Sequence, residues 1–299
     1  MMPGSRQAPR RAWRTGKWQD GDRALPEEVA VAFTYDGTAH AVMMATPDDL
    51  RDFAIGFSLT EGIVTNPDEI EALEIVPLPA GIDLRFWLQS GRGEALAARR
   101  RRMAGPVGCG MCGLETLSQT RRSVPTVGEG IMLSPAAIEA ALETLPPAQA
   151  LNAETHAVHA AAFWHPHRGL VALREDVGRH NALDKLAGAL STRAVPAAEG
   201  MVMMTSRISV ELVQKAAMMR VPLLAGISAP TTLALEVAEA AGITVLGICR
   251  RDGFEVFTHP YRVREAESPR DCHLMEMAAT AGASRAEGQR QRPEGLQMS

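Results

Sequence analysis

Residues 223–249 read LLAGISAPTTLALEVAEAAGITVLGIC, and this stretch decides the fold class. An apolar strand over 223–227 is followed by a helix over 232–241, which Gly242 closes, and then by an apolar strand over 243–249. A strand, a helix and a strand at this spacing pair in parallel through a right-handed crossover. The stretch therefore predicts helices packed against a largely parallel sheet.

The same rhythm continues on both sides of that stretch. We expect strands at 170–173, 201–205 and 254–258, and helices at 181–190 and 210–220. Strands that alternate with helices in this way are typical of an α/β fold.

The first half of the chain has a different pattern, which begins with a hairpin. Alternating apolar residues at 29–35, a turn at Asp36-Gly37 and a return at 41–45 predict two antiparallel strands. A helix is expected to begin at Thr46, with Pro47 in its first turn, and to end at Gly62. We also expect a strand at 82–89 and a helix from Ser134 to about Leu145, which Pro146-Pro147 would end. We divide the chain into a mobile arm (1–26), an N-terminal part with the hairpin and a cysteine loop (27–150), an α/β part (151–263) and a frayed tail (264–299).

The 299-residue chain carries 31 basic and 35 acidic side chains, a formal charge of −4. A protein that binds nucleic acid through bulk electrostatics would be far more basic, so we expect no nucleic acid partner. Four cysteines in so long a chain fit a reducing compartment. Neither a signal peptide nor an apolar run of about 18 residues appears, so we expect a cytoplasmic protein that does not enter the membrane.

Four loops are expected to leave the carboxyl ends of the α/β strands, where ligands bind in open sheets of this kind. They span 174–181, 205–207, 228–231 and 249–253. Guanidinium groups, hydroxyls and free backbone N–H groups suit phosphate, so these loops predict an anionic, phosphorylated ligand. Solvated arginines would be the commoner explanation for one loop alone, but four loops converge on one edge. The arginines in these loops are Arg174, Arg179, Arg207, Arg250 and Arg251.

A glycine-rich loop carries two thiols, Cys109 and Cys112, in a C-x-x-C pattern. A helix expected at 114–121 and the four arginines at 99–102 would favour the thiolate form of these cysteines. The pattern alone leaves three alternatives open: half of a zinc site, a dithiol redox pair, or a carrier that holds sulfur as a persulfide.

Two sequence motifs, and their order along the chain, resemble the formate dehydrogenase accessory sulfurtransferase family, FdhD. The first is GCGMCG at 108–113, and the second, which is far more specific, is REDVGRHNALDK at 174–185. The resemblance extends over about residues 29–262. Four further segments also resemble sequence landmarks of this family: 206–207, 214–217, 227–231 and 258–260.

This resemblance implies a cytidine-deaminase-like fold, a three-layer α/β/α sandwich with an N-terminal hairpin-containing subdomain. It also implies a sulfur carrier that accepts sulfur from a cysteine desulfurase as a persulfide on Cys109, with Cys112 assisting. The sulfur would pass to the molybdenum cofactor, as bis-molybdopterin guanine dinucleotide, before that cofactor enters formate dehydrogenase. A homodimer is implied as well.

The family's cofactor-binding stretch falls on 248–253, which is one of the four loops that topology selected. We expect His180 and Asp176 to handle protons or to contact phosphate. A helix cap is an equally good explanation for Asp176, which lies just before a helix. The candidate cofactor contacts are Ile248, Cys249, Arg250, Arg251, Asp252, Gly253, Arg179, His180 and Arg207.

The chain departs from the family pattern at residues 155–159, which read Thr-His-Ala-Val-His where Thr-Gly-Gly-x-His is usual. The histidines His156 and His159 keep a zinc site with the cysteines open. A zinc deaminase would instead need H-x-E before its C-x-x-C, and that order is absent from the sequence. The remaining alternative is a non-catalytic chaperone that binds the cofactor while Cys109 and Cys112 are structural.

Overall fold

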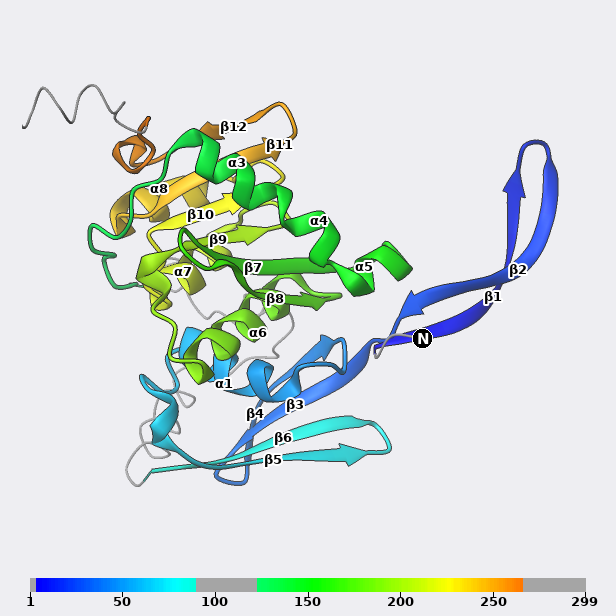
Figure 1. The fold of residues 1–299 in the computed structure, drawn as a ribbon. Coiled ribbons are helices and arrows are strands. Elements are labelled where there is room, and N and C mark those ends of the chain that lie inside the picture. Colours follow the sequence, from blue (N-terminus) through cyan, green and yellow to red (C-terminus); the bar gives the residue numbers. More distant parts are fainter. Residues whose placement is uncertain (1–3, 90–122, 266–299) are drawn as a thin grey trace, which may run out of the picture.

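The computed structural model describes residues 4–89 and 123–265, and Figure 1 shows their arrangement. A six-stranded sheet has the order β12-β11-β10-β9-β7-β8. Its three central strands β9, β10 and β11 pair in parallel, as predicted. The strands are β7 (His159–His165), β8 (Gly169–Asp176), β9 (Met201–Met204), β10 (Leu223–Gly226), β11 (Thr244–Arg250) and β12 (Gly253–Val256).

Two strands of this sheet run against the others. β7 is antiparallel to both β8 and β9, and β12 is antiparallel to β11. Short turns at 166–168 and 251–252 allow only this direction, because a parallel connection needs a crossover. β8 therefore runs in the same direction as β9, β10 and β11, and all four carboxyl ends lie at one edge.

Helices cover both faces of the six-stranded sheet, which confirms the predicted α/β/α class. One face packs on α6 (Arg179–Thr192), α7 (Val210–Met218) and α8 (Thr232–Ala241). The other face packs on α3 (Pro135–Glu143) and α4 (Leu145–Ala148). Residues 135–148 belong to the stretch that we assigned to the N-terminal part, yet they pack on the sheet of the later residues.

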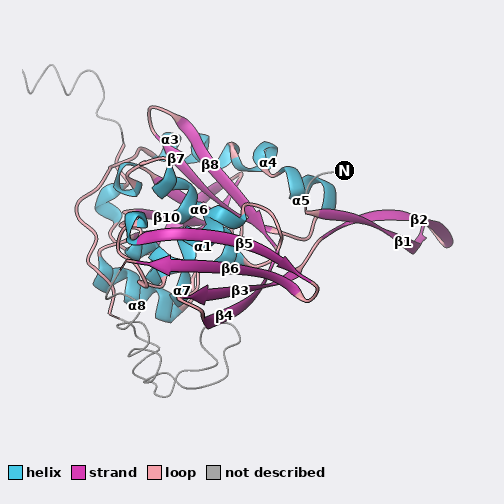
Figure 2. Ribbon diagram, turned by 90° about the horizontal axis from the view of Figure 1, so that it is seen from below, coloured by secondary structure: helices cyan, strands magenta, loops and turns pink. Residues whose placement is uncertain are grey.

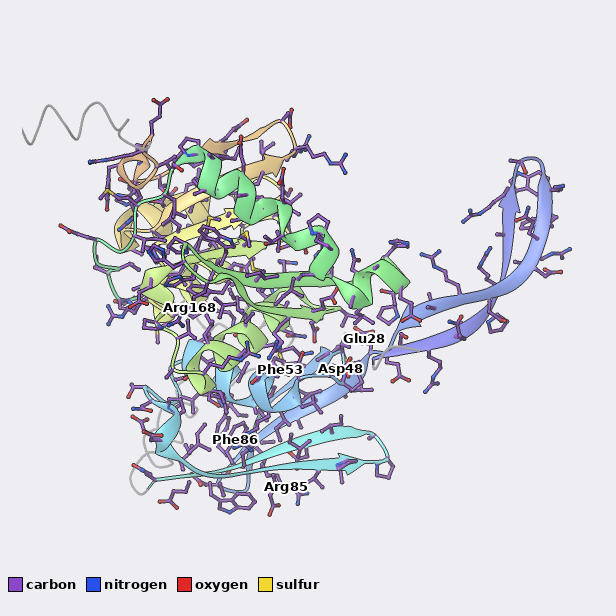
Figure 3. The ribbon with its side chains drawn as sticks, viewed as in Figure 1. Glu28, Asp48, Phe53, Arg85, Phe86 and Arg168 are labelled. Carbon is purple, nitrogen blue, oxygen red and sulfur yellow. The ribbon has the colours of Figure 1, made fainter. Side chains whose placement is uncertain are left out.

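A second, four-stranded sheet has the order β4-β3-β6-β5, and α1 (Leu50–Thr60) covers its inner face (Figure 2). Aromatic rings fill the contact: Phe33 packs against Phe53 and Phe57 of α1 and against Phe86 of β6. Figure 3 labels Phe53 and Phe86 on the two sides of this contact. The expected hairpin at 29–45 is confirmed. The strands are β3 (Val29–Tyr35), β4 (Thr38–Ala45), β5 (Ile70–Leu78) and β6 (Gly81–Leu88).

The two sheets are joined through a close crossing of α1 and α6. A Cβ atom on Gly56 would lie 1.7 Å from the carbonyl oxygen of Asp184, and one on Gly188 would lie 2.0 Å from that of Asp52. Each helix therefore uses a glycine so that its backbone can touch the other helix, and any larger side chain would force them apart.

The expected start of α1 is wrong by about four residues. The helix begins at Leu50 after Asp49, whose φ of 52° lies in the left-handed region. Thr46, the expected cap, is fully buried and hydrogen bonded to the second half of the chain. By contrast, α3 begins as predicted, with the Ser134 hydroxyl accepting from the amide of Ala137.

The helix-breaking effect expected of Pro146-Pro147 is only partly observed. α3 ends at Glu143, but the prolines then lie in the first turn of α4, where no amide donor is needed. A further helix, α5 (Ala150–Thr155), was not expected. Short 3-10 turns occupy η1 (Pro67–Glu69), η3 (Ala197–Glu199) and η4 (Pro260–Arg262).

The N-terminal stretch that we expected to be a mobile arm contains a regular antiparallel hairpin. β1 (Ser5–Arg14) and β2 (Lys17–Pro26) pair along their full length. Thr15 and Gly16 form a two-residue turn, both with positive φ, which matches the twist of the flanking strands. The sequence signal was this Thr-Gly pair. Among the described residues, no helix is long and apolar enough to cross a membrane.

Candidate functional site

The loops at the carboxyl edge of the six-stranded sheet lie side by side. The amide of Ile227 donates to Met204, that of Thr231 to Ile208, and that of Ile248 to Ser228. These backbone hydrogen bonds link the loops after β9, β10 and β11 into one continuous rim. The expectation that these loops share an edge is therefore confirmed.

Three of the candidate arginines are exposed on this rim. Arg207 lies between β9 and α7, and Arg250 and Arg251 lie at the turn from β11 to β12. Within residues 4–89 and 123–265, no carboxylate pairs with any of the three. As far as the described residues show, their guanidinium groups are therefore available to bind an anion.

Arg174 is not available in this way. Its guanidinium group is paired with Asp52 at 2.5 Å and Asp49 at 3.4 Å, and its side chain is mostly buried. It ties β8 to α1 instead of facing a ligand.

The stretch 248–253 divides into exposed and buried members. Cys249 lies in the core with α3, and burial raises the pKa of its thiol to about 11. Ile248 has a φ of 51°, a strained conformation for a β-branched residue, at a bulge in the pairing of β11 with β12. Asp252 is exposed beside Arg251, and Gly253 has a φ of 134°. The bulge carries the two arginines out to the rim while Cys249 remains inside.

Asp176 of the second motif is a structural residue. Its Oδ1 accepts from the amide of Gly178 at 2.8 Å and from Asn181 Nδ2 at 2.9 Å, which caps the turn into α6. Its Oδ2 accepts from the amide of Thr46 at 3.1 Å and lies 2.7 Å from Lys185 Nζ. Both side chains of this ion pair are fully buried. Because no polar atom faces solvent, Asp176 holds the two halves of the chain together.

A second buried ion pair, which our sequence reading missed, lies between α6, α7 and α1. Lys215 Nζ is 2.9 Å from Asp184 Oδ1 and 2.7 Å from Glu61 Oε1, and Thr60 also donates to Asp184. Burial raises the pKa of Asp184 to about 6, although Lys215 opposes the shift. The signal was a charged residue in each of two otherwise apolar helix faces.

Beside this pair, the N-termini of α6 and α7 bring several buried polar atoms together. His180 Nε2 and Glu211 Oε2 lie 3.9 Å apart. Arg179 Nε, Ser209 Oγ and both of these atoms are buried without a hydrogen bond among the described residues. His180 is therefore largely buried, with 19% of its side chain exposed, and Arg179 is half-buried.

The burial of His180 predicts a pH dependence of stability. Burial, with Arg179 and Lys215 adding to it, lowers the pKa of His180 from 6.5 to about 4. The unfolded chain therefore binds more protons between these values, and the native protein loses stability as the pH falls through this window. From pH 7 to pH 4.5 we expect His180 to account for a loss of about 2 kcal/mol. Urea unfolding of wild type and His180→Gln at both pH values measures this difference, and parallel pH profiles would exclude it.

The structure does not test the roles expected of the cysteine pair, because Cys109 and Cys112 lie outside the described residues. Cys249 is the one cysteine among the residues that the structure describes. His156 ends α5 with a φ of 55°, a conformation that suits the glycine usual in the family. Among the described residues, no group of three metal-binding side chains forms with His156 or His159.

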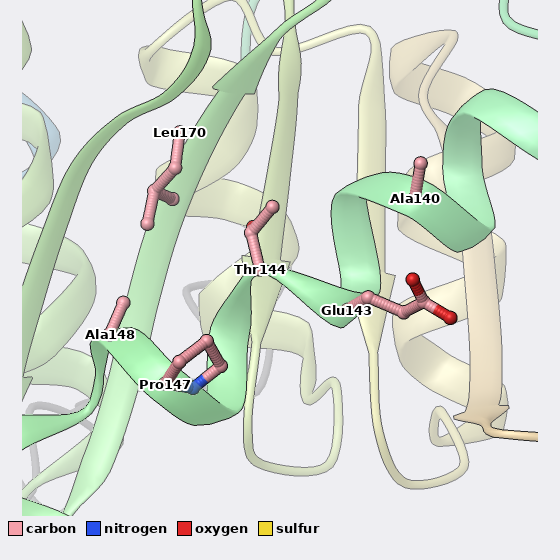
Figure 4. Close-up of a pocket in the computed structure, with 6 residues that line it drawn as sticks. All are labelled: Ala140, Glu143, Thr144, Pro147, Ala148 and Leu170. Carbon is pink, nitrogen blue, oxygen red and sulfur yellow. The ribbon is translucent and has the colours of Figure 1, made fainter.

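A hollow between α3, α4 and β8 lies on the face of the six-stranded sheet that α3 and α4 cover, away from the rim (Figure 4). Its described lining consists mainly of small apolar side chains with one carboxylate, Glu143, and it contains no basic group. It does not suit an anionic ligand, so the rim remains the candidate site.

The three layers and the rim of exposed arginines define an α/β protein whose strand ends are suited to an anionic ligand. The profile of the FdhD/NarQ family matches residues 26–264, and the chain belongs to this family, which confirms the resemblance. The sulfur carrier protein FdhD of Agrobacterium fabrum is 52% identical over 259 residues, 86% of this chain and 96% of that protein. That of Variovorax paradoxus is 46% identical over 264 residues, 88% of this chain and 95% of that protein.

A crystal structure shares the fold. It is that of a protein assigned as a formate dehydrogenase accessory protein from Desulfotalea psychrophila. The TM-score is 0.70 at 24% identity, and the match covers 88% of this chain and all of the other.

Proposed function

We propose that this protein is a sulfur carrier that serves formate dehydrogenase in the cytoplasm. The observation that carries the proposal is the 52% identity to a sulfur carrier protein over nearly the whole length of that relative. The finer proposal is that sulfur travels as a persulfide on Cys109 from a cysteine desulfurase to the molybdenum cofactor.

In the first step, the Cys109 thiolate attacks the terminal sulfur of the persulfide on the desulfurase. A new S–S bond forms on Cys109, and the desulfurase cysteine leaves as a thiolate. This exchange changes no net oxidation state and needs no further reactant. The basic run at 99–102 supports it, because positive charge favours the thiolate form.

In the second step, the transferred sulfur must be released as sulfide, which requires two electrons. Cys112 is suited to supply them. Its thiolate attacks the inner sulfur, Sγ of Cys109, a Cys109–Cys112 disulfide forms, and hydrosulfide leaves toward the cofactor. Two cellular monothiols, or one dithiol, would then reduce the Cys109–Cys112 disulfide before the next cycle and would themselves become a disulfide.

The cofactor is the cargo of this reaction, and its diphosphates suit the rim. Arg207, Arg250 and Arg251 are exposed there and unpaired among the described residues. Arg207 lies three residues before α7, so the positive end of that helix dipole adds to the charge of the rim. These groups would bind and orient the guanine dinucleotide portion of the cargo.

Removal of the rim arginines is expected to weaken nucleotide binding. Because each charge-assisted hydrogen bond contributes roughly 1.5–3 kcal/mol, Arg250→Ser and Arg207→Ser should each raise the Kd for guanosine diphosphate about tenfold or more. Calorimetry measures this change. The control is Arg168→Ser, since Arg168 is exposed at the β7–β8 turn, on the opposite edge (Figure 3). Equal affinities in all variants would show that the nucleotide does not bind at this rim.

The chaperone alternative makes a different prediction for the cysteines. Wild type incubated with a cysteine desulfurase and cysteine should gain the mass of sulfur, and Cys109→Ser should not. A chaperone with structural cysteines would gain none in either form. A zinc enzyme would instead contain stoichiometric zinc that is lost in Cys112→Ser.

A further inference from the structure

Three histidine–carboxylate pairs occur among residues 4–89 and 123–265, and one of them differs from the other two. In two pairs the carboxylate is largely exposed, by 55% and 65%, and the closest atoms are 3.7 Å apart: His165 with Glu199 and His259 with Glu239. In the third pair, His180 Nε2 lies 3.9 Å from Glu211 Oε2, and the two side chains are only 19% and 18% exposed. A charge that is largely buried acts on its neighbour with little screening by salt and water, which singles out this pair.

The buried pair is also the one at the carboxyl edge of the six-stranded sheet. His180 lies in the first turn of α6, which follows β8, and Glu211 lies in the first turn of α7, which follows β9. Arg207 of the rim is four residues before Glu211. The exposed pairs lie at the opposite edge, since Glu199 precedes β9 and Glu239 lies in the last turn of α8, which leads back to the start of β11. The buried pair therefore lies at the edge where we propose that the cargo binds.

The surroundings of His180 oppose a positive charge on its ring. Burial lowers the pKa of His180, and the charges of Arg179 and Lys215 add to this effect. The positive ends of the α6 and α7 dipoles act in the same direction. Glu211 and Glu61 act against these groups and raise the pKa of His180. The ring is therefore neutral near pH 7, and Glu211 is the carboxylate 3.9 Å from it that favours its protonated form.

Glu211 keeps its own charge although it is largely buried. Burial raises the pKa of its carboxyl, but Ser209, the backbone of Glu211, His180 and Arg179 together outweigh burial and lower it. The facing atoms, His180 Nε2 and Glu211 Oε2, make no hydrogen bond within the part of the chain that the structure describes. At 3.9 Å they are too far apart to bond directly, so Glu211 acts on the ring through its charge. A neutral imidazole beside a carboxylate can accept a proton and pass it on.

The proposed release of sulfur needs such a transfer. The Cys112 thiol gives up a proton when it becomes the attacking thiolate, and the terminal sulfur of an ionised persulfide takes up a proton when it leaves as hydrosulfide. The rim arginines cannot carry this proton, because arginine stays protonated in proteins. A histidine can carry it.

We propose that His180 carries this proton and that Glu211 is the residue that positions the ring and stabilises its protonated form. The inference rests on the proposed function. The imidazole takes the proton of the Cys112 thiol, and the thiolate attacks Sγ of Cys109. The bond from this Sγ to the terminal sulfur breaks with its electron pair on that sulfur, which takes the proton from the imidazolium and leaves as hydrosulfide. The cysteine pair supplies the two electrons and the proton is conserved, so no further reactant is needed.

Single-turnover release of sulfur tests this assignment. The protein is loaded from radiolabelled cysteine by a desulfurase, freed from it and mixed with the cofactor, and the loss of label from Cys109 is followed. Glu211→Gln should slow release at pH 7 at least about tenfold, since a positioned acid–base group contributes roughly 10²–10⁴-fold. Glu211→Asp, which keeps the carboxylate, should regain part of the rate. Glu239→Gln, from an exposed pair, is the matched control and should leave the rate unchanged.

Two further readouts separate proton transfer from a structural role. His180→Ala/Glu211→Gln should be no slower than His180→Ala, because Glu211 acts through the ring that is already lost. Added imidazole should restore part of the rate of His180→Ala. Circular dichroism checks the fold of each variant.

Wild-type release by Glu211→Gln, additive losses in the double variant, or no rescue by imidazole would each overturn the proposal. Loading of Cys109 by the desulfurase needs no proton carrier and should be unchanged in every variant. A wild type that never gains sulfur would instead contradict the proposed function, so the two failures are distinguishable.

Discussion

Replacement of Lys185 by Met is expected to lower the free energy of unfolding by about 3–5 kcal/mol. The variant leaves the Asp176 carboxylate buried without its cation, which lies 2.7 Å away in a fully buried pair. It also removes the hydrogen bond from Lys185 to the carbonyl of Thr46. The contact between the two halves of the chain would then lose its central charge. Urea unfolding at pH 7 measures the effect.

Two further variants sharpen this prediction. Lys17→Met, at the exposed hairpin tip, should change stability by less than about 0.5 kcal/mol. The double variant Asp176→Asn/Lys185→Met should regain part of the loss, because no unpaired charge remains buried. A Lys185→Met protein as stable as wild type would show that the pair does not hold the halves together.

Cys109→Ser is expected to reduce formate dehydrogenase activation to background in cells that lack the wild-type protein. Serine cannot carry a persulfide, so the chain of sulfur transfer would end at the desulfurase. Cys112→Ser should still gain sulfur but should fail to release it, since no second thiol supplies the electrons. The control is Cys249→Ala, because Cys249 is buried in the core with a raised pKa. Full activity of Cys109→Ser would exclude the persulfide.

The central part of the fold could be predicted from sequence because its signals are local. Strand, helix and strand at 223–249 were predicted from apolar runs and from Gly242 at the helix end, and the structure confirms them. The structure adds the cap, Thr231, whose hydroxyl accepts from the amide of Ala234. β7 could not be found in the same way, since its alanine-rich run lacks β-branched residues. β5 has little alternation because it is an exposed edge strand.

The site was only partly predictable. The rim was found from strand order alone, and Arg207, Arg250 and Arg251 are indeed exposed there. Sequence could not distinguish these arginines from Arg174, because its partners Asp49 and Asp52 are more than a hundred residues away in the chain. The same is true of Thr46, which has the pattern of a helix cap but is hydrogen bonded to Asp176.

One feature of the sequence does indicate the buried ion pairs. The chain has only three lysines, and two of them, Lys185 and Lys215, lie within helices among apolar neighbours. A lysine in such a position is rarely buried unless it is paired, so each predicts a carboxylate partner. The identity of that partner depends on tertiary packing, which no local pattern contains.

The most direct measurement follows one labelled sulfur atom through a single cycle. The protein is loaded from radiolabelled cysteine by a desulfurase, freed from the desulfurase, and mixed with the molybdenum cofactor in its guanine dinucleotide form. We predict that the label leaves Cys109 and appears on the cofactor, with Arg250→Ser slowing this transfer and Arg168→Ser leaving it unchanged. Label that stays on the protein, or that never binds Cys109, would contradict the account.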